Sequence, residues 1–170
     1  MIGHRALNCL GLFACVASLL FAIFYLEKTL HLDPCPLCIL DRIVLVGMGI
    51  IFFLSMMHDS KSIFSKIYSL LVVTLSLTGI GLASRHIWLQ NLPADRVPEC
   101  GPDLYFMLET LPFFDVVKRV FTGSGSCAQV DWTFAGLSIP WQTLILFTCL
   151  LLLSSLLVTK AWRPRSAGCE

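Results

Sequence analysis

Four stretches of this chain are apolar over nearly the ~20 residues that an α-helix needs to cross the hydrocarbon core of a bilayer. They run over residues 9–26, 37–57, 67–88 and 141–158. Of the 170 residues, 56% are apolar and only 14% are charged, whereas about 25% of the residues in a soluble domain are charged. We therefore predict an all-α membrane protein, a four-transmembrane-helix bundle that forms a single domain over residues 1–170.

The positions of the basic residues predict the orientation of these helices. The chain carries 12 Lys and Arg against 11 Asp and Glu, so it lacks the excess of basic residues that a nucleic-acid partner requires. Short cytoplasmic flanks of membrane spans are enriched in basic residues. Both termini are therefore expected to face the cytoplasm, and the loop of about 89–140 is expected on the outer side. The six basic residues on the cytoplasmic side are Arg5, Lys61, Lys66, Lys160, Arg163 and Arg165.

The middle of the outer loop has the pattern of a short amphipathic helix. Apolar residues recur there at helical spacing, and Asp115 and two basic residues occupy the opposite face. Such a helix lies in the membrane interface, either as a cap over the bundle or as the anchor of a mobile loop. The apolar positions are Phe113, Phe114, Val117, Val120 and Phe121, and the basic ones are Lys118 and Arg119.

The eight cysteines divide by compartment under this topology. Cys9, Cys15 and Cys149 lie within spans, and Cys169 lies in the cytoplasmic tail, where thiols stay reduced. We assign these four no role, because buried cysteines commonly pack as small apolar side chains. The other four fall on the outer side, where disulfides persist. They are Cys35, Cys38, Cys100 and Cys127.

Cys35 and Cys38 form a CxxC motif at the outer mouth of the second span. This spacing permits a small reversible disulfide whose thiolate is stabilised by a helix N-terminus. Arg42 follows Cys38 by four residues, so its guanidinium can reach the helix face that carries the Cys38 sulfur. A charge within the edge of a span indicates function, and an Arg that simply extends to the interface is the alternative. Asp41 points elsewhere on the helix and is expected to reach water.

Cys100 and Cys127 enclose 26 residues of the outer loop, and both are flanked by Gly, Ser or Pro. Flexible surroundings favour access by other thiols. A purely structural disulfide is the alternative, and closing a loop of this length stabilises the fold by roughly 3 to 4 kcal/mol in the chain-entropy model. All four outer cysteines could also bind zinc, but zinc sites usually carry paired short spacings and only one CxxC is present. We therefore predict no metal.

Taken together, these features resemble the disulfide-bond formation protein B (DsbB) family. The most specific part is the segment 35–42, CPLCILDR, joined to SGSCA at 124–128 and WTFAGL at 132–137. The resemblance implies a thiol:quinone oxidoreductase of the bacterial inner membrane. Such an enzyme re-oxidises DsbA, a soluble dithiol oxidase of the periplasm, and passes the electrons to a membrane quinone, either ubiquinone or menaquinone.

The resemblance also implies a role for each outer cysteine. Cys38 would face the quinone, and Cys35 would exchange with Cys127. Cys100 would form the mixed disulfide with the DsbA-like partner. All four redox cysteines would lie on the periplasmic side.

Two further residues are implied to lie at the quinone. Arg42 would support the quinone site, and His86, at the outer end of the third span, matches a histidine that the family places nearby. A histidine hydrogen-bonded to water at the interface is the alternative for His86. Pro36, inside the CxxC motif, departs from the best-known members of the family, which bears on the redox potential of this pair.

Two other functions fit parts of the pattern. A protein similar to vitamin K epoxide reductase also uses a four-span bundle and quinone-linked cysteines, but its membrane-edge CxxC typically lies late in the chain. A non-catalytic four-span scaffold with a disulfide-stapled outer loop has no use for Arg42 or for an exposed CxxC. The thiol:quinone oxidoreductase is therefore the function we expect.

Overall fold

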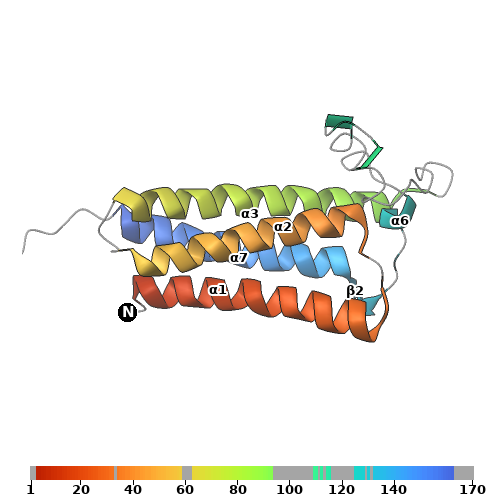
Figure 1. The fold of residues 1–170 in the computed structure, drawn as a ribbon, viewed down its shortest axis with the longest axis horizontal. Helices are drawn as coiled ribbons and strands as arrows, with labels where there is room; N and C mark the ends of the chain where they lie inside the picture. The colour runs from red at the N-terminus through yellow and green to blue at the C-terminus, as the bar shows by residue number, and fades with distance from the viewer. Residues whose placement is uncertain are drawn as a thin grey trace, which may run out of the picture.

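Four long helices form an elongated bundle in the computed structural model (Figure 1). The structure describes residues 3–32, 34–58, 63–93, 109–110, 112, 114–115, 125–128, 130 and 132–162. The first helix, α1 (His4–Leu20), runs directly into the π-helix η1 (Phe21–Thr29). The other three long helices are α2 (Pro36–Met57), α3 (Ile63–Gln90) and α7 (Ile139–Ala161).

Four helices of the described residues are long and apolar enough to cross a membrane, which confirms the predicted helical membrane bundle. Each predicted span lies inside one of them, and the helices extend further at most ends. The first helix begins at His4, and the buried Asn8 is accommodated in its first turns by donating from Nδ2 to the His4 carbonyl oxygen at 3.0 Å. The second begins at Pro36, since a proline at the first helical position has no N–H to leave unpaired.

The outer segment before α7 carries a small β-hairpin in addition to the predicted helices. β1 (Thr133–Phe134) pairs antiparallel with β2 (Leu137–Ser138). Ala135 and Gly136 have φ angles of 52° and 80°, the positive values that a two-residue type I′ turn requires. The hairpin leads directly into α7, so it fixes where the last long helix begins.

The bundle is held together by an apolar core along its length. The most extensive contact is that between α3 and α7. The contact of α1 with α2 comes next, followed by that of α2 with α3. Phe52, Met48 and Phe147 are completely buried between these helices. On the outside, side chains as large as Phe13 and Leu70 are exposed. A continuous apolar exterior of this kind is suited to lipid, because a soluble protein exposes only small apolar patches.

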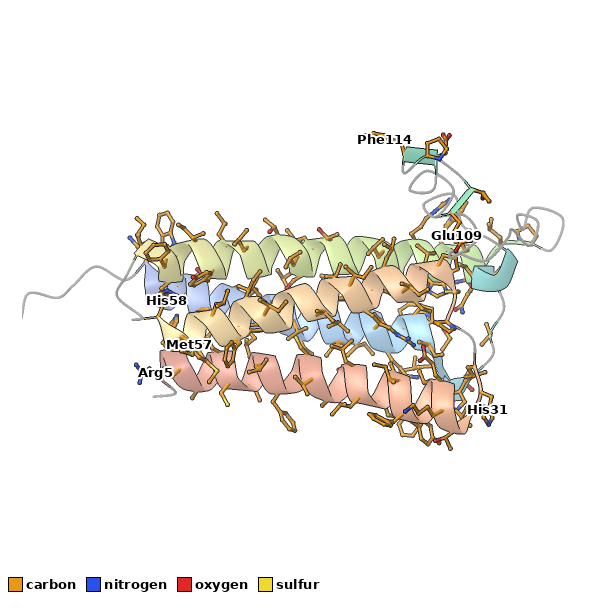
Figure 2. The ribbon with its side chains drawn as sticks, viewed as in Figure 1. Arg5, His31, Met57, His58, Glu109 and Phe114 are labelled. Carbon is orange, nitrogen blue, oxygen red and sulfur yellow. The ribbon has the colours of Figure 1, made fainter. Side chains whose placement is uncertain are left out.

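The two ends of the bundle differ in what they carry. At one end, Ser65 Oγ lies 3.0 Å from His4 Nε2, and the Lys66 ammonium lies 5.3 Å from the ring centre of Trp162. These contacts bring together the starts of α1 and α3 and the end of α7. Figure 2 shows Arg5 and His58 at this end and His31 at the other. The short helix α6 (Gly125–Ala128) and the hairpin also lie at the end marked by His31 (Figure 1).

Several predicted features lie outside the described residues. Of the proposed interfacial helix, only Phe114 and Asp115 are described; both are exposed, Phe114 at 84%. The rest of that helix stays a prediction. Cys100 and Cys169 are also outside the described residues, as are the basic residues Lys61, Arg163 and Arg165.

Two glycines allow the closest approaches between helices. A Cβ atom added at Gly11 of α1 would overlap the ring of Phe52 on α2, and one added at Gly79 of α3 would overlap the ring of Phe147 on α7. Both rings are completely buried, so they cannot move aside without disturbing a close-packed core. These contacts fix the spacing of two helix pairs.

We expect Gly79→Ala to lower the free energy of unfolding by about 1 to 3 kcal/mol, the usual effect of overpacking a core. The measurement is the thermal unfolding midpoint of the detergent-solubilised protein. Gly81→Ala is the matched control, because Gly81 lies on the same helix and a Cβ there meets no atom within 4 Å. The control should hold or raise the midpoint, since alanine is the better helix former. Equal midpoints for the two variants would contradict this account of the packing.

Candidate functional site

The CxxC motif lies at the first turn of α2. Cys35 is the residue just before the helix, Pro36 opens it, and the Cys38 backbone N–H donates to Cys35 Sγ at 3.4 Å. The two sulfur atoms are 3.1 Å apart. Partial positive charge at a helix N-terminus favours a thiolate. The local sequence therefore produces a close dithiol at the end of a membrane helix.

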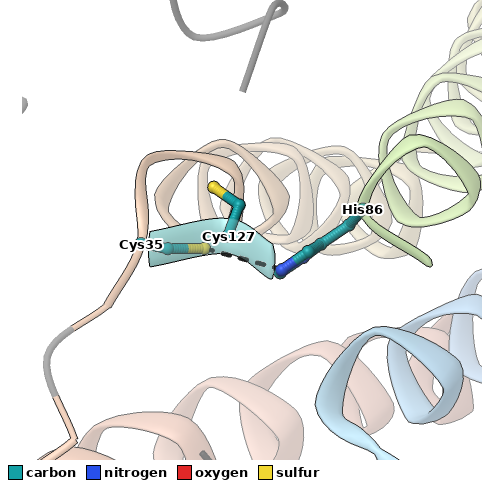
Figure 3. A group of neighbouring side chains, drawn as sticks. All are labelled: Cys35, His86 and Cys127. Atoms are coloured by element: carbon teal, nitrogen blue, oxygen red, sulfur yellow. Dashed lines mark hydrogen bonds between the residues drawn. The ribbon is translucent and has the colours of Figure 1, made fainter. Parts of the chain in front are cut away.

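Two residues distant in sequence meet Cys35 at this point. His86, on α3, places its Nε2 atom 3.8 Å from Cys35 Sγ. Cys127, on α6, is completely buried, and the two sulfurs and Nε2 all lie within 4.8 Å of one another. Figure 3 shows the three side chains converging from three separate elements. Cys35 and Cys127 are thus close enough for exchange after a small movement.

The same three atoms satisfy the distance requirement of a metal site. Two thiols and an imidazole are suitable zinc ligands, but a structural zinc site usually has four protein ligands. The zinc alternative drawn from the sequence needed all four outer cysteines, and Cys100 lies outside the described residues. The same distances also suit disulfide exchange between the thiols. The geometry therefore does not decide between the two, and the absence of a metal stays a prediction.

Arg42 forms an ion pair with Glu27. The contact runs from Arg42 Nη1 to Glu27 Oε1, between α2 and η1. Arg42 also lines the same cavity as Cys38, and its expected reach to the helix face of the Cys38 sulfur stays a prediction. The Arg42 and Glu27 side chains are largely buried, with 21% and 28% of their surfaces exposed. The pairing explains how a charge is accommodated near the edge of a span, since the alternative of a lone interfacial Arg leaves it unpaired.

Glu27 is a residue that the sequence analysis missed. It lies in the π-helical segment that ends the first long helix, and π-helical turns are frequent at functional sites. A sequence signal was available: an acid near the end of one span and a base near the start of the next meet when the spans form a hairpin.

A cavity of about 400 Å³ opens beside the dithiol. This volume lies within the range of small-molecule sites, about 300 to 1,000 Å³. Cys38, Arg42 and His86 contribute to one part of its wall, together with Cys35 and Gln90. The remainder is mainly apolar and comes from α1, η1, the segment before α2, α2, α7 and Trp132; it includes Phe21, Ala22, Leu26, Leu45, Ile139 and Leu146.

Asp41 also lines this cavity, and here the sequence analysis was wrong. We expected Asp41 to reach water, but only 5% of it is exposed. Its Oδ1 atom has no hydrogen-bond partner among the described residues. The error arose because the helical position of Asp41 was judged against the bilayer alone, whereas neighbouring helices enclose it.

His86 is likewise buried, with 4% of its surface exposed. The alternative of a histidine at a water-exposed interface is therefore wrong. While Nε2 faces Cys35, the Nδ1 atom is buried without a hydrogen-bond partner in the described part of the chain. The two ring nitrogens of His86 thus have different surroundings.

Three of the four cysteines that we assigned no role are described, and they lie away from this cluster. Cys15 is completely buried in the apolar core between α1 and α2, and Cys9 and Cys149 are exposed on the outside of the bundle. None of these three lines the cavity.

Comparisons with known proteins bear on this site. Residues 4–157 match the family model of Disulfide bond formation protein DsbB. A Disulfide bond formation protein B from a Psychrobacter species is 43% identical over 171 residues, which cover 98% of each chain. The proteins of that name from Nitrosococcus oceani and Marinobacter nauticus are 47% and 40% identical, over 81% and 90% of this chain and 81% and 91% of their own.

A membrane-spanning bundle with a dithiol at the end of one span and a third cysteine beside it defines a membrane thiol–disulfide oxidoreductase. The extent of the sequence match makes the assignment specific: the chain belongs to the DsbB family. Proteins of this family are the membrane partners that re-oxidise DsbA in disulfide bond formation. The family predicted from the sequence is thereby confirmed.

The approach of Cys35 to Cys127 leads to a direct test. In a protein carrying Cys38→Ser and Cys100→Ser, we expect mild oxidation to join Cys35 to Cys127, because their sulfurs lie within 4.8 Å. Mass spectrometry of non-reduced peptides identifies the bond. The matched control adds Cys127→Ser and should leave Cys35 open to alkylation. Full alkylation of both cysteines in the first protein would show that they do not meet.

Proposed function

We propose that this protein is a thiol:quinone oxidoreductase that oxidises a DsbA-like thiol oxidase and passes the electrons to a quinone, ubiquinone or menaquinone, in the cavity beside Cys38. The observation that carries this proposal is the position of the dithiol in the wall of an otherwise mainly apolar cavity. An isoprenoid quinone has an apolar body and two carbonyl oxygens. The apolar wall suits the body, and Arg42, His86 and Gln90 supply polar groups for the oxygens.

A non-thiol acceptor is required on energetic grounds. Exchange among thiols only moves a disulfide from one pair to another. The established potential of DsbA is about −120 mV and that of thioredoxin about −270 mV, a gap of ~150 mV or ~7 kcal/mol for two electrons. A dithiol with an ordinary potential cannot therefore keep DsbA oxidised. A quinone is a non-thiol acceptor that takes up the two electrons and two protons that a dithiol releases.

The proposed order of exchange is supported by the proximity of Cys35 and Cys127. We assign to Cys100, in the outer loop, the attack by the partner thiol and the mixed disulfide that results. Displaced Cys127 then exchanges with Cys35, whose sulfur lies within 4.8 Å. Cys38 is the member of the CxxC pair that delivers electrons into the cavity. The guanidinium of Arg42 favours thiolate and the negative charge that develops during reduction.

The proposed location is the bacterial inner membrane, with both termini in the cytoplasm and the redox cysteines on the periplasmic side. Arg5 and Lys66 lie at the end of the bundle opposite the dithiol. Basic residues mark cytoplasmic flanks, and the periplasm is the compartment in which disulfides persist. This orientation gives a soluble periplasmic partner access to the outer loop.

The two alternatives from the sequence are set aside. A protein similar to vitamin K epoxide reductase would carry its CxxC late in the chain, whereas this one opens α2, the second long helix. A scaffold offers no reason for the ion pair of Arg42 and Glu27 near the edge of a span or for the cavity next to Cys38. Membership in the DsbB family agrees with both conclusions.

Replacing Arg42 tests the quinone site. Arg42→Met keeps an unbranched stem but removes the charge, and losing a charge-assisted hydrogen bond of ~1.5 to 3 kcal/mol reduces turnover roughly 10- to 150-fold. We expect a raised KM for quinone or a lowered kcat in steady-state assays, while one equivalent of partner is still oxidised in a single turnover. Arg42→Lys should recover part of the loss.

The control for Arg42 is Arg85→Met. Arg85 lies on α3 with its guanidinium carbon 4.1 Å from the ring centre of Trp88, and it does not line the cavity. This variant should keep wild-type quinone kinetics. Unchanged kinetics in a folded Arg42→Met protein would remove Arg42 from the acceptor site.

The role of Cys100 is tested by trapping the partner. A DsbA-like protein that lacks the second cysteine of its active site should accumulate as a mixed disulfide on Cys100. The trapped complex should be most abundant with Cys127→Ser, since the resolving thiol is then absent. Peptide mapping of the non-reduced complex locates the bond. Trapping mainly on Cys35 or Cys38 would reverse the assigned order of exchange.

A further inference from the structure

Asp41 is a buried carboxyl group that the exchange of disulfides does not use. Only 5% of its surface is exposed, and Oδ1 has no hydrogen-bond partner among the described residues. Burying a polar group without a partner costs about 1 to 3 kcal/mol, and a charged one costs more. An apolar residue at this position would avoid that cost, so packing alone does not account for Asp41.

The surroundings of Asp41 place it beside the redox chemistry. Asp41 follows Cys38 by three residues on α2, which puts the two side chains on neighbouring positions of one helix surface. Both side chains line the same cavity. The nearby guanidinium of Arg42 is paired with Glu27, so a carboxylate partner for that cation is already present.

His86 is the imidazole that faces the dithiol. Its Nε2 atom lies 3.8 Å from Cys35 Sγ, and its Nδ1 atom is buried without a hydrogen-bond partner in the described part of the chain. His86 and Asp41 both line the cavity. Two buried polar atoms that lack partners among the described residues therefore belong to side chains on the wall of one cavity.

Reduction of a quinone in this cavity has to move protons as well as electrons. When the Cys35 and Cys38 dithiol becomes a disulfide, two S–H bonds break and one S–S bond forms. The quinone gains two electrons, and two O–H bonds form on its oxygens. Side chains positioned beside the reacting oxygens speed such proton transfers.

We propose that the buried Asp41 carboxyl group delivers one of these protons to a quinone oxygen. This inference rests on the proposed quinone site. Asp41 gives its proton to one oxygen and becomes a carboxylate, while His86 Nε2, 3.8 Å from Cys35 Sγ, takes the Cys35 proton and becomes an imidazolium. The Cys38 proton passes to the other oxygen as the sulfur–sulfur bond forms. Uptake of one proton by Asp41 and release of one by His86 then restore both groups before the next turnover.

The test uses the full-length protein with Asp41→Asn, an isosteric change that removes the transferable proton. Positioned acid–base groups contribute about 10²- to 10⁴-fold to rates, so reduction of added ubiquinone by the pre-reduced protein should slow by about that factor. The KM for quinone should change little. Asp41→Glu should recover much of the rate, and the wild-type rate should fall in D₂O.

The thermal unfolding midpoint distinguishes a role of Asp41 in proton transfer from a structural role. If Asp41 acts through proton transfer, Asp41→Asn should leave the thermal unfolding midpoint unchanged or raised, because an amide is cheaper to bury than an unpaired carboxyl group. Ser76→Ala is the control; Ser76 is a completely buried polar residue of α3 that bonds the Val72 carbonyl oxygen and does not line the cavity. It should reduce quinone at the wild-type rate.

Three results would overturn the proposal: a wild-type rate in Asp41→Asn, a loss confined to KM, or a loss that Asp41→Glu fails to recover. If Asp41→Asn does not fold, the side chain is structural and the proposal is wrong. Failure of the quinone site itself is distinguishable, since the wild-type protein would then reduce no quinone at all. Oxidation of one equivalent of partner by Asp41→Asn confirms that its disulfides are intact.

Discussion

The bilayer imposes the constraint on which this structure depends: no backbone polar group can be left unpaired in the hydrocarbon core. Long helices meet that requirement, and they leave unpaired N–H groups only at their ends. The reactive dithiol lies at such an end, at the first turn of α2, where the Cys38 N–H donates to Cys35 Sγ. The location of the chemistry thus follows from the way a helical bundle satisfies its backbone.

The polar side chains around the cavity also need partners, and some of them are supplied by neighbouring helices. Arg42 is accommodated near the membrane edge by Glu27, which the π-helical end of the first long helix carries to it. His86 is held between helices with one nitrogen toward Cys35. Buried groups of this kind are costly when unpaired. Their concentration at one end of the bundle, around a cavity of about 400 Å³, is consistent with a site for a polar head on an apolar molecule.

The sequence predicted the fold well because hydropathy and length alone identify membrane helices. It also predicted the CxxC at a helix start, since that depends on neighbouring residues. Contacts between distant elements were harder to predict, and the ion pair of Arg42 with Glu27 was missed. Asp41 was expected in water because one helix considered alone does not reveal what its neighbours enclose. The exchange of Cys35 with Cys127 was expected from the family resemblance and not from spacing, whereas the contact of His86 with Cys35 was not expected at all.

The most direct test is the stoichiometry of quinone reduction under anaerobic conditions. Purified protein is mixed with an excess of reduced DsbA-like oxidase and ubiquinone, and quinone absorbance is followed together with the partner's thiols. The account predicts one quinone reduced for each partner disulfide formed, over many turnovers. Partner oxidation that stops at the protein's own disulfides while quinone stays oxidised would contradict it.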